Sequence, residues 1–454
     1  MKLSKAQATV IALLNILIVA LLAIIFLVPV IRDNVVAGGN NGGGNSGSTD
    51  APPIDTGDDP PPSHNKLRPP SAGATDEIAR ETRLMGNGDE TVVATFFSDD
   101  VIYIFGNATV SGLDFDSYGG FLCRMSDGGT ILSYTYFDGT MTAACTLGTT
   151  YVVAAGNVVY GVDGEGNAVA RLDAENVVDL FGKDGNKIAV VTQPSQTSLK
   201  YTEYSMGSEQ WTSGFVTRID CGYTLKYFDC YDFGGAAVIA ARAHSLPMYD
   251  SLVFYKFMPG GDASAMYYGG SGENKLRPYA VMPSSFGYFA LTASSGGIAT
   301  IISVDYGFTS YHSFSLGFTF DDARAMFVGG KYYASFDRSD GAVTYEIEGD
   351  LSRRRLNVAD GVFVDCALGG SGASVLVGTA PERMSTGDKT STTAYIVSVY
   401  AQKILPLDMT AARFCGAHYY GGEITLVLSA TGGTALSAPT AGRDIYVVTI
   451  GNDW

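Results

Sequence analysis

One pattern occurs three times in the chain, as VVDLFGKDGNKIAVV (177–191), FDCYDFGGAAVIAA (228–241) and VDCALGGSGASVLV (364–377). Each copy has a run of β-branched and aromatic residues, a glycine turn and a second apolar run. Residues of these types favour strands, and a glycine turn between two such runs predicts a β-hairpin. Hairpins that recur about every 40–50 residues are typical of the blades of a propeller.

A second type of hairpin follows the first, as in FLCRMSDGGTILSYTYF (121–137) and VVYGVDGEGNAVARL (158–172). Its Asp-Gly turns suit tight hairpins. Two hairpins make one four-stranded blade, so the sequence predicts an all-β fold: a β-propeller of eight four-stranded blades, with seven blades as the alternative. The expected blades begin near residues 90, 141, 177, 224, 277, 321, 361 and 412.

The last unit supplies three clear strands, ARFCGAHYY, EITLVLS and RDIYVVTI, and lacks a fourth. The segment EIARETRLMG (77–86) precedes the first blade and is expected to fill this place. The domain is therefore expected to span residues 77–454. Closure of a ring by both ends of the chain removes open sheet edges, which otherwise invite aggregation.

The N-terminus predicts membrane attachment. Residues 8–31 are almost wholly apolar, long enough for a helix that crosses a bilayer, and are not followed by a convincing cleavage site. A cleaved signal peptide is the competing interpretation. Lys2 and Lys5 precede the run, so we expect a single-pass anchor with the C-terminal domain outside the cytoplasm. Residues 32–76, rich in Gly, Asn and Pro, are expected to form a disordered tether.

Charge and residue types restrict the partners. The formal charge is −17, and with +2 from residues 1–31 and −3 from residues 32–76 the remainder carries −16. Nucleic-acid binding needs clustered Lys and Arg, so no nucleic-acid partner is expected. The six cysteines show no CxxC pair or metal-ligand spacing, so we expect no metal and no cofactor.

The turn from Asp163 to Gly166 has the form Asp-x-x-Gly. In this respect the chain resembles bacterial propellers of the general PQQ-like or YVTN-like repeat type. The resemblance covers the domain and implies its architecture. It carries over no functional residues, because the chain lacks a WD dipeptide and the other docking patterns of specific families.

The expected loops are longest on one face of the propeller. Second-to-third-strand loops are long in blades 1, 4, 7 and 8, and repeat proteins often place insertions on the face that binds. Blades 7, 8 and 1 become neighbours when the ring closes, which predicts a raised sector. Neutral drift of tolerant loops is the alternative explanation. The candidate ligand-binding residues are Asp114, Phe115, Asp116 and Tyr118 in blade 1, Arg242 and His244 in blade 4, and Glu382 and Arg383 in blade 7.

Two acidic features have structural explanations as well as functional ones. Three aspartates are expected at equivalent positions of the inner strands: Asp179, Asp229 and Asp365. A ring of carboxylates could bind a cation, but hydrogen bonds from neighbouring backbone amides are the preferred interpretation. The segment DGEGN (163–167) has acidic groups spaced as in a calcium loop and lacks the rest of that pattern, so a hairpin turn is preferred.

No recognisable set of catalytic residues is present, and none of the domain's histidines lies in a nucleophile or metal motif. The sequence therefore favours a binding module that recognises an envelope protein, a wall polymer or an extracellular ligand. The alternative is an envelope polysaccharide hydrolase or lyase that uses Asp114, Asp116 or Glu382. Glycoside chemistry needs two carboxyl groups about 5–10 Å apart.

Overall fold

The computed structural model describes residues 78–450 with gaps at 87, 99, 112–113, 184, 208–210, 221–223, 234–235, 245–249, 258–262, 270–277, 294–296, 308, 329–330, 340, 349–351, 357–362, 370–373, 384–388, 399–403, 408–412, 421–422 and 432–441. These residues form strands and turns only. The strands make eight four-stranded antiparallel sheets.

The first four sheets follow the chain order. Blade 1 contains β2 (Glu90–Ser98), β3 (Val101–Ala108), β4 (Gly119–Ser126) and β5 (Ile131–Phe137). Blade 2 contains β6 (Met141–Leu147), β7 (Thr150–Ala155), β8 (Val158–Val162) and β9 (Ala168–Asp173). Blade 3 contains β10 (Val177–Lys183), β11 (Lys187–Ser195), β12 (Ser198–Met206) and β13 (Trp211–Asp220). Blade 4 contains β14 (Thr224–Phe233), β15 (Ala236–His244), β16 (Asp250–Phe257) and β17 (Ala263–Gly269).

The other four sheets complete the set. Blade 5 contains β18 (Pro278–Pro283), β19 (Gly287–Ala293), β20 (Ile298–Asp305) and β21 (Tyr311–Thr319). Blade 6 contains β22 (Asp322–Val328), β23 (Lys331–Asp337), β24 (Val343–Ile347) and β25 (Arg353–Arg355). Blade 7 contains β26 (Phe363–Gly369), β27 (Ser374–Arg383), β28 (Lys389–Ser398) and β29 (Ile404–Leu407). Blade 8 contains β30 (Arg413–Tyr420), β31 (Glu423–Thr431), β32 (Arg443–Ile450) and β1 (Ile78–Leu84).

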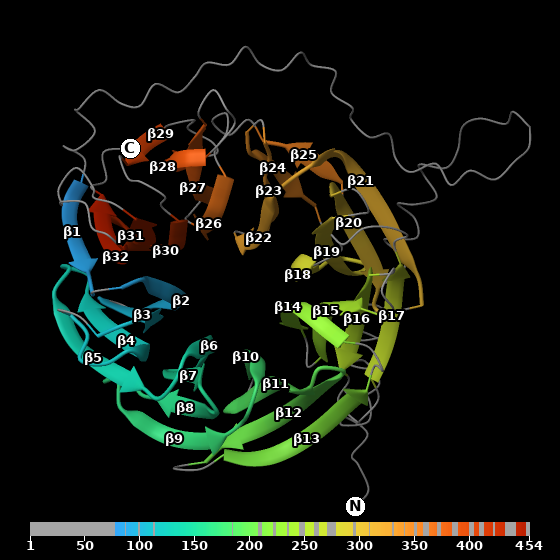
Figure 1. The fold of residues 1–454 in the computed structure, drawn as a ribbon, viewed down its shortest axis with the longest axis horizontal. Coiled ribbons are helices and arrows are strands. Elements are labelled where there is room, and N and C mark those ends of the chain that lie inside the picture. The colour runs from blue at the N-terminus through green and yellow to red at the C-terminus, as the bar shows by residue number, and fades with distance from the viewer. Residues whose placement is uncertain are drawn as a thin grey trace, which may run out of the picture. The chain divides into compact units, whose positions relative to one another are not determined.

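The first strands of the blades line the centre of a ring (Figure 1). Each contacts the first strand of the next blade, and β30 of blade 8 contacts β2 of blade 1, so the ring of contacts is complete. The domain is a β-propeller. Large buried side chains such as Phe105, Tyr201 and Phe289 fill the space between neighbouring sheets.

The two ends of the described chain meet in blade 8. Strand β1 pairs antiparallel with β32, with Ile78 opposite Ile450 and Leu84 opposite Ile445. The outer strand of this blade therefore comes from a segment more than 300 residues away in sequence.

The propeller has two faces with different connections. On the loop face lie the loops between second and third strands and the links between blades; on the turn face lie the two hairpin turns of each blade. Strand β1 runs from the turn face to the loop face because it is antiparallel to β32, which ends at the turn face. The chain therefore enters the propeller on the turn face, opposite the face where the sequence placed the binding sector.

The fold class expected from the sequence needs correction in its range of blade counts. The alternative of seven blades is wrong, because the strands form eight separate sheets. The expected fold also began with a transmembrane helix, and residues 8–31 lie outside the described residues. Within the part of the chain that the structure describes, no helix is long and apolar enough to cross a membrane.

Candidate functional site

The loop between β3 and β4 of blade 1 carries four of the predicted site residues. The Asp114 carboxylate accepts a hydrogen bond from the Met85 N–H at 2.6 Å, and the Asp114 N–H donates to the Met85 carbonyl. The Asp116 N–H donates to the Tyr136 hydroxyl at 2.9 Å. The Asp114 contacts fix the loop to the link that joins β1 to β2, and the Asp116 contact fixes it to β5.

Phe115 was expected on the binding surface, and this prediction is wrong. Its side chain is 1% exposed. Its ring lies 4.6 Å from that of Phe121 and 5.6 Å from that of Tyr134, within a cluster that also contains Val447 of blade 8. The physical reason is that the loop folds back over the seam between blades 1 and 8, where an aromatic ring gains more by burial than by exposure.

The same loop leaves two predicted residues accessible. Tyr118 is 74% exposed, Asp116 is exposed, and Val110 at the start of the loop is exposed as well. The loop is thus anchored by Asp114 and Phe115 and presents Tyr118 and Asp116. An aromatic side chain on an anchored loop loses little entropy when it binds.

The other four predicted residues lie in strands and not in loops. Arg242 and His244 belong to β15, opposite Leu252 and Asp250 of β16. Glu382 and Arg383 belong to β27, opposite Ser391 and Lys389 of β28. The sequence was misleading here because polar residues and a proline interrupt the apolar alternation, while the ladder continues through them. The remaining loop residues, 245–249 and 384–388, lie outside the described residues.

The three inner-strand aspartates Asp179, Asp229 and Asp365 lie at the same distance from the end of the first strand of their blade. Asp179 and Asp229 pair with Val191 and Ala240, whereas Asp365 lies at an irregularity of the ladder between Val364 and Cys366. The Asp179 carboxylate accepts from the Leu180 N–H at 2.8 Å, and Asp229 accepts from the Val281 N–H of the next blade at 2.5 Å. The preferred interpretation, hydrogen bonding to backbone amides, is confirmed for these two.

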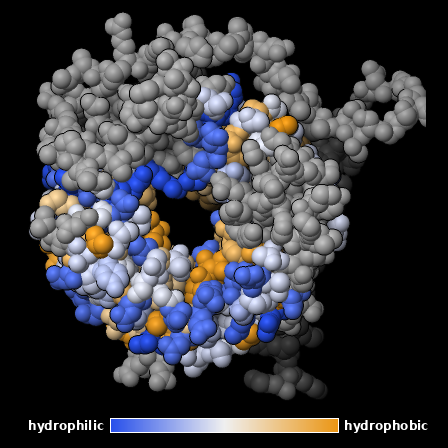
Figure 2. Space-filling model, viewed as in Figure 1, coloured by the Kyte–Doolittle hydropathy of each residue, from blue (hydrophilic) through white to orange (hydrophobic). Residues whose placement is uncertain are grey.

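Burial changes the acidity of this pair. Desolvation raises the pKa of Asp179 to about 6, and desolvation together with the charge of Asp179 raises the pKa of Asp229 to about 7. Cys230 directly follows Asp229 and is half-buried, and desolvation together with the charges of Asp179 and Asp229 raises its pKa well above the usual value. Hydrophobic surface borders the open channel beside β10 and β14, which carry the two aspartates (Figure 2). No group of three or more potential metal ligands occurs among the residues that the structure describes.

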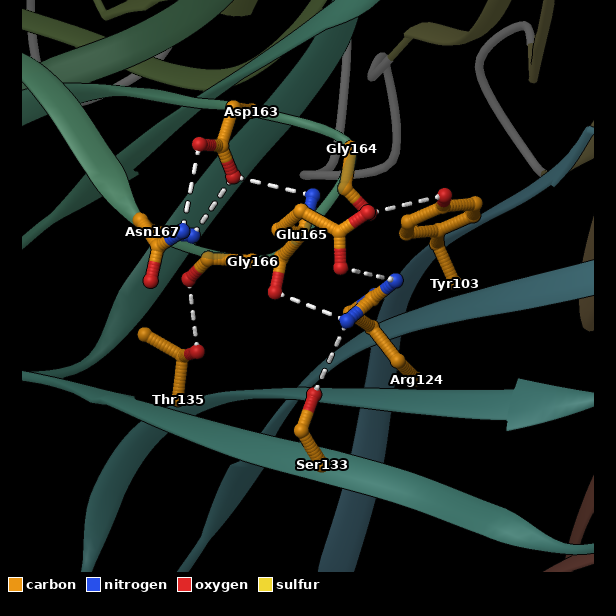
Figure 3. Close-up of polar contacts among 9 residues, drawn as sticks. All are labelled: Tyr103, Arg124, Ser133, Thr135, Asp163, Gly164, Glu165, Gly166 and Asn167. Carbon is orange, nitrogen blue, oxygen red and sulfur yellow. Dashed lines mark hydrogen bonds and ion pairs between the residues drawn. The ribbon is translucent and has the colours of Figure 1, made fainter.

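The DGEGN segment is a hairpin turn, as preferred from the sequence. The Asp163 carboxylate accepts hydrogen bonds from the N–H groups of Glu165 (2.9 Å) and Asn167 (2.8 Å), so its oxygens serve the turn itself (Figure 3). Burial is the largest single effect and raises the pKa of Asp163, but the hydrogen bonds of the turn together outweigh it, so the pKa is lowered.

This turn also docks on blade 1 (Figure 3). Arg124 of β4 donates to the Glu165 carbonyl at 2.8 Å and pairs with the Glu165 carboxylate at 3.2 Å. Tyr103 donates to the Gly164 carbonyl and Thr135 to the Gly166 carbonyl, at 3.0 and 2.7 Å. A turn whose carbonyls are bound by the preceding blade fixes the angle between the two sheets.

The docking recurs between blades 4 and 5. The Asp305 carboxylate accepts from the N–H groups of Thr309 and Ser310, and Lys256 of β16 donates to the Tyr306 carbonyl at 2.5 Å. Arg124 and Lys256 both lie in the third strand of their blades. Sequence analysis missed this device, although a cation in the third strand followed by an Asp-initiated turn about 40–50 residues later is a readable signal.

Exposed aromatic side chains gather on the turn face. Phe286 is 61% exposed and Phe327 is 52% exposed, and Tyr306 is also exposed. The Tyr306 N–H donates to the Phe286 carbonyl at 3.3 Å, and the ring of half-buried Tyr332 lies 4.6 Å from that of Phe327. Burial raises the pKa of Tyr332, and Tyr231 and Tyr306 raise it further, which places Tyr332 near Tyr306.

We call Phe286, Tyr306, Phe327 and Tyr332 the aromatic surface; it joins blades 5 and 6. The aromatic surface was not expected from the sequence, because its residues lie at short turns and only the long loops were expected to bind. The readable signal is an aromatic residue one or two positions before the glycine of a turn, as in SFG (285–287), DYG (305–307) and MFVGG (326–330).

A hollow on the turn face separates blades 8 and 1. It is lined by Arg80, Phe97, Asp100, Val101, Ile102, Asp127, His418, Glu423 and Thr425. Arg80 pairs with the Glu423 carboxylate and donates to the Asp127 carbonyl, while the His418 and Phe97 rings are stacked 4.7 Å apart. Burial lowers the pKa of His418, so its ring is neutral at pH 7.

No family model and no curated protein matches the chain. Among solved structures, the chain is similar to the Dos1 propeller, with 12% identity over 83% of this chain and 96% of that one and a TM-score of 0.49. It is also similar to the WD40 domain of SCAP from fission yeast, with 12% identity over 83% and 99% of the two chains and a TM-score of 0.46. A prolyl endopeptidase structure gives 11% identity over 81% and 58%, with a TM-score of 0.44. These likenesses concern architecture and say nothing of function.

Proposed function

We propose that the protein is an anchored binding module whose propeller recognises a partner protein through the aromatic surface. The observation that carries this proposal is the exposure of Phe286, Tyr306 and Phe327 at one blade seam. Aromatic side chains are enriched in the cores of protein interfaces, where they supply apolar area at low entropic cost. Single exposed apolar residues are ordinary, whereas a contiguous group of them marks an interaction site.

The aromatic surface is held rigidly. The Tyr306 hydroxyl donates to the Ser284 carbonyl at 2.9 Å, and the Tyr306 ring packs edge-on against buried Tyr288. Lys256 fixes the Tyr306 carbonyl from the neighbouring blade. A surface that is ordered before binding loses less entropy in the complex.

The N-terminal run 8–31 would hold this module to a membrane, with the propeller outside the cytoplasm. Support for that arrangement comes from the length of the apolar run and from Lys2 and Lys5 before it. Protease added to intact cells that express the full-length protein should then remove the propeller. Protection of the propeller until the cells are lysed would contradict the orientation.

The binding face is tested with two matched pairs of exposed residues in the full-length protein. A photo-crosslinking amino acid is placed at Phe327 or at Tyr118, and adducts formed in cells are identified by mass spectrometry. We expect adducts with a defined protein from position 327, and their loss in the Phe286→Ser/Tyr306→Ser variant.

The matched control is Val110→Ser/Tyr118→Ser on the loop face, which should leave adducts from position 327 unchanged. Adducts from position 118 alone would return the site to the loop face that the sequence favoured. Absence of specific adducts from both positions would contradict the proposed function.

No observation favours the alternative of a polysaccharide hydrolase or lyase. Of its expected carboxylates, Asp114 is bound by the Met85 N–H, and Glu382 lies in strand β27 of another blade.

A further inference from the structure

The seam that closes the ring contains two buried carboxyl groups and one cation. Glu90, the first residue of β2, is 0% exposed, and Asp444 near the start of β32 is 1% exposed. Arg83 of β1 donates to one Asp444 oxygen through Nη2 at 2.6 Å and Nε at 3.0 Å. Arg83 and Asp444 therefore form a buried ion pair between the outer two strands of blade 8.

Among the residues that the structure describes, Glu90 has no such partner. Both of its carboxyl oxygens are buried without a hydrogen bond. Gly86 lies against the carboxyl group so closely that a Cβ there would collide with it. Burial of an ionised carboxylate without a partner costs several kcal/mol, so the neutral acid is strongly preferred at such a position.

We propose that Glu90 and Asp444 form a proton-binding latch: one proton, held on Glu90, keeps the ring closed where β1 and β32 meet β2, and its loss loosens that seam. With the proton bound, Glu90 is neutral and Arg83 balances Asp444. Without it, two buried carboxylates face a single guanidinium. This inference is independent of the aromatic surface, which lies on the other face.

Other groups around Glu90 favour the proton too. Burial first, then the charge of Asp444 and a smaller effect of Asp89, raise the pKa of Glu90 to about 7, although the backbone of Gly86 acts in the opposite direction. Asp89 itself is exposed and accepts from the Arg443 N–H at 2.8 Å. Of the strands packed against β2, β30 contributes Arg413, which is exposed, and His418, which stacks on Phe97 at the opposite end of β2 and whose pKa is lowered by burial. β3 and β6 contain no charged residue. The charged residue of β31, Glu423, lies at its opposite end.

The sign of the pH effect follows from these values. The pKa of Glu90 is about 7 in the folded protein against 4.5 for the free group, so the folded seam holds the proton more tightly. Its stabilising contribution is complete below pH 4.5 and is lost as the pH rises through 7. For these two values, the equilibrium constant for opening of the seam increases about 30-fold between pH 5.5 and 8.5.

Hydrogen exchange of the full-length protein measures this opening. Exchange of β1 and β32 amides should accelerate about 30-fold from pH 5.5 to 8.5. Buried amides of β23 in the same molecule supply the correction for the intrinsic pH dependence. Glu90→Gln, which keeps the shape and removes the ionisation, should abolish this acceleration and keep the seam closed at pH 8.5. Glu175→Gln, which changes an exposed acid between β9 and β10, is the control and should behave like the wild type.

A second variant covers the case in which Glu90→Gln does not fold. Asp444→Asn retains Glu90 and removes the neighbouring charge, so the midpoint of the pH dependence should move below 7. Wild-type pH dependence in Glu90→Gln, or an unchanged midpoint in Asp444→Asn, would overturn the latch.

Discussion

Replacement of Phe115 by alanine separates a binding role of this residue from a core role. The side chain is 1% exposed and packs on Phe121, Tyr134 and the core of blades 1 and 8. A buried phenylalanine removes about 150–200 Å² from water, which at about 25 cal/mol per Å² corresponds to about 4–5 kcal/mol. Measured costs of Phe→Ala in cores are about 3–5 kcal/mol because the cavity collapses only in part. We therefore expect Phe115→Ala to lower the free energy of unfolding by about 4 kcal/mol.

Urea unfolding of the full-length protein in detergent measures this loss, with the fluorescence of buried Trp211 and circular dichroism as two independent probes. Tyr118→Ala, three positions along the same loop and 74% exposed, is the matched control and should stay within about 0.5 kcal/mol of the wild type. A loss below about 1 kcal/mol for Phe115→Ala would refute the reasoning. Phe115 would then belong to the exposed loop that the sequence suggested.

Two further substitutions test the contacts inside the ring. Arg124→Ala removes the hydrogen bonds from blade 1 to the Glu165 turn and should lower the free energy of unfolding by about 1–3 kcal/mol in the same assay. Arg171→Ala breaks an exposed ion pair and should lower it by less than about 0.5 kcal/mol. Equal losses in the two variants would contradict the docking role of Arg124. Asp229→Asn should make the stability of the protein less dependent on pH. The reason is that burial raises the pKa of Asp229 to about 7, so that protonation of this carboxyl group stabilises the fold fully below pH 3.8 and the stabilisation is lost as the pH rises through 7. Melting temperatures between pH 4 and 8.5 test this, and a variant less stable than the wild type at pH 8.5 would argue against it.

Local pattern was enough to place the strands. The glycine turns and the alternation of apolar residues put the starts of the blades near 177, 224 and 321, and the first strands of those sheets begin at Val177, Thr224 and Asp322. Hairpin geometry depends on residues close in sequence, which is why a single chain shows it. The membrane segment and tether remain predictions from composition, since residues 1–77 lie outside the described part of the chain.

The sequence predicted the strands more accurately than it predicted which residues lie in exposed loops. Glu382 and Arg383 look like loop residues because they are charged and follow Pro381, yet they pair with β28. Phe115 looks like an exposed anchor and is a core residue. In both cases the deciding contact comes from a strand or blade that the local sequence does not contain.

By itself, the sequence determined the repeat, the strand boundaries and the acidic character of the domain, because these depend on residue type and short-range periodicity. Tertiary structure alone decided what ring closure brings together: Glu90 against Asp444, the exposed aromatic side chains at the seam of blades 5 and 6, and the burial of Phe115. Each of these depends on contacts between blades. The sequence of one blade does not show which residues of the neighbouring blade will bury its side chains.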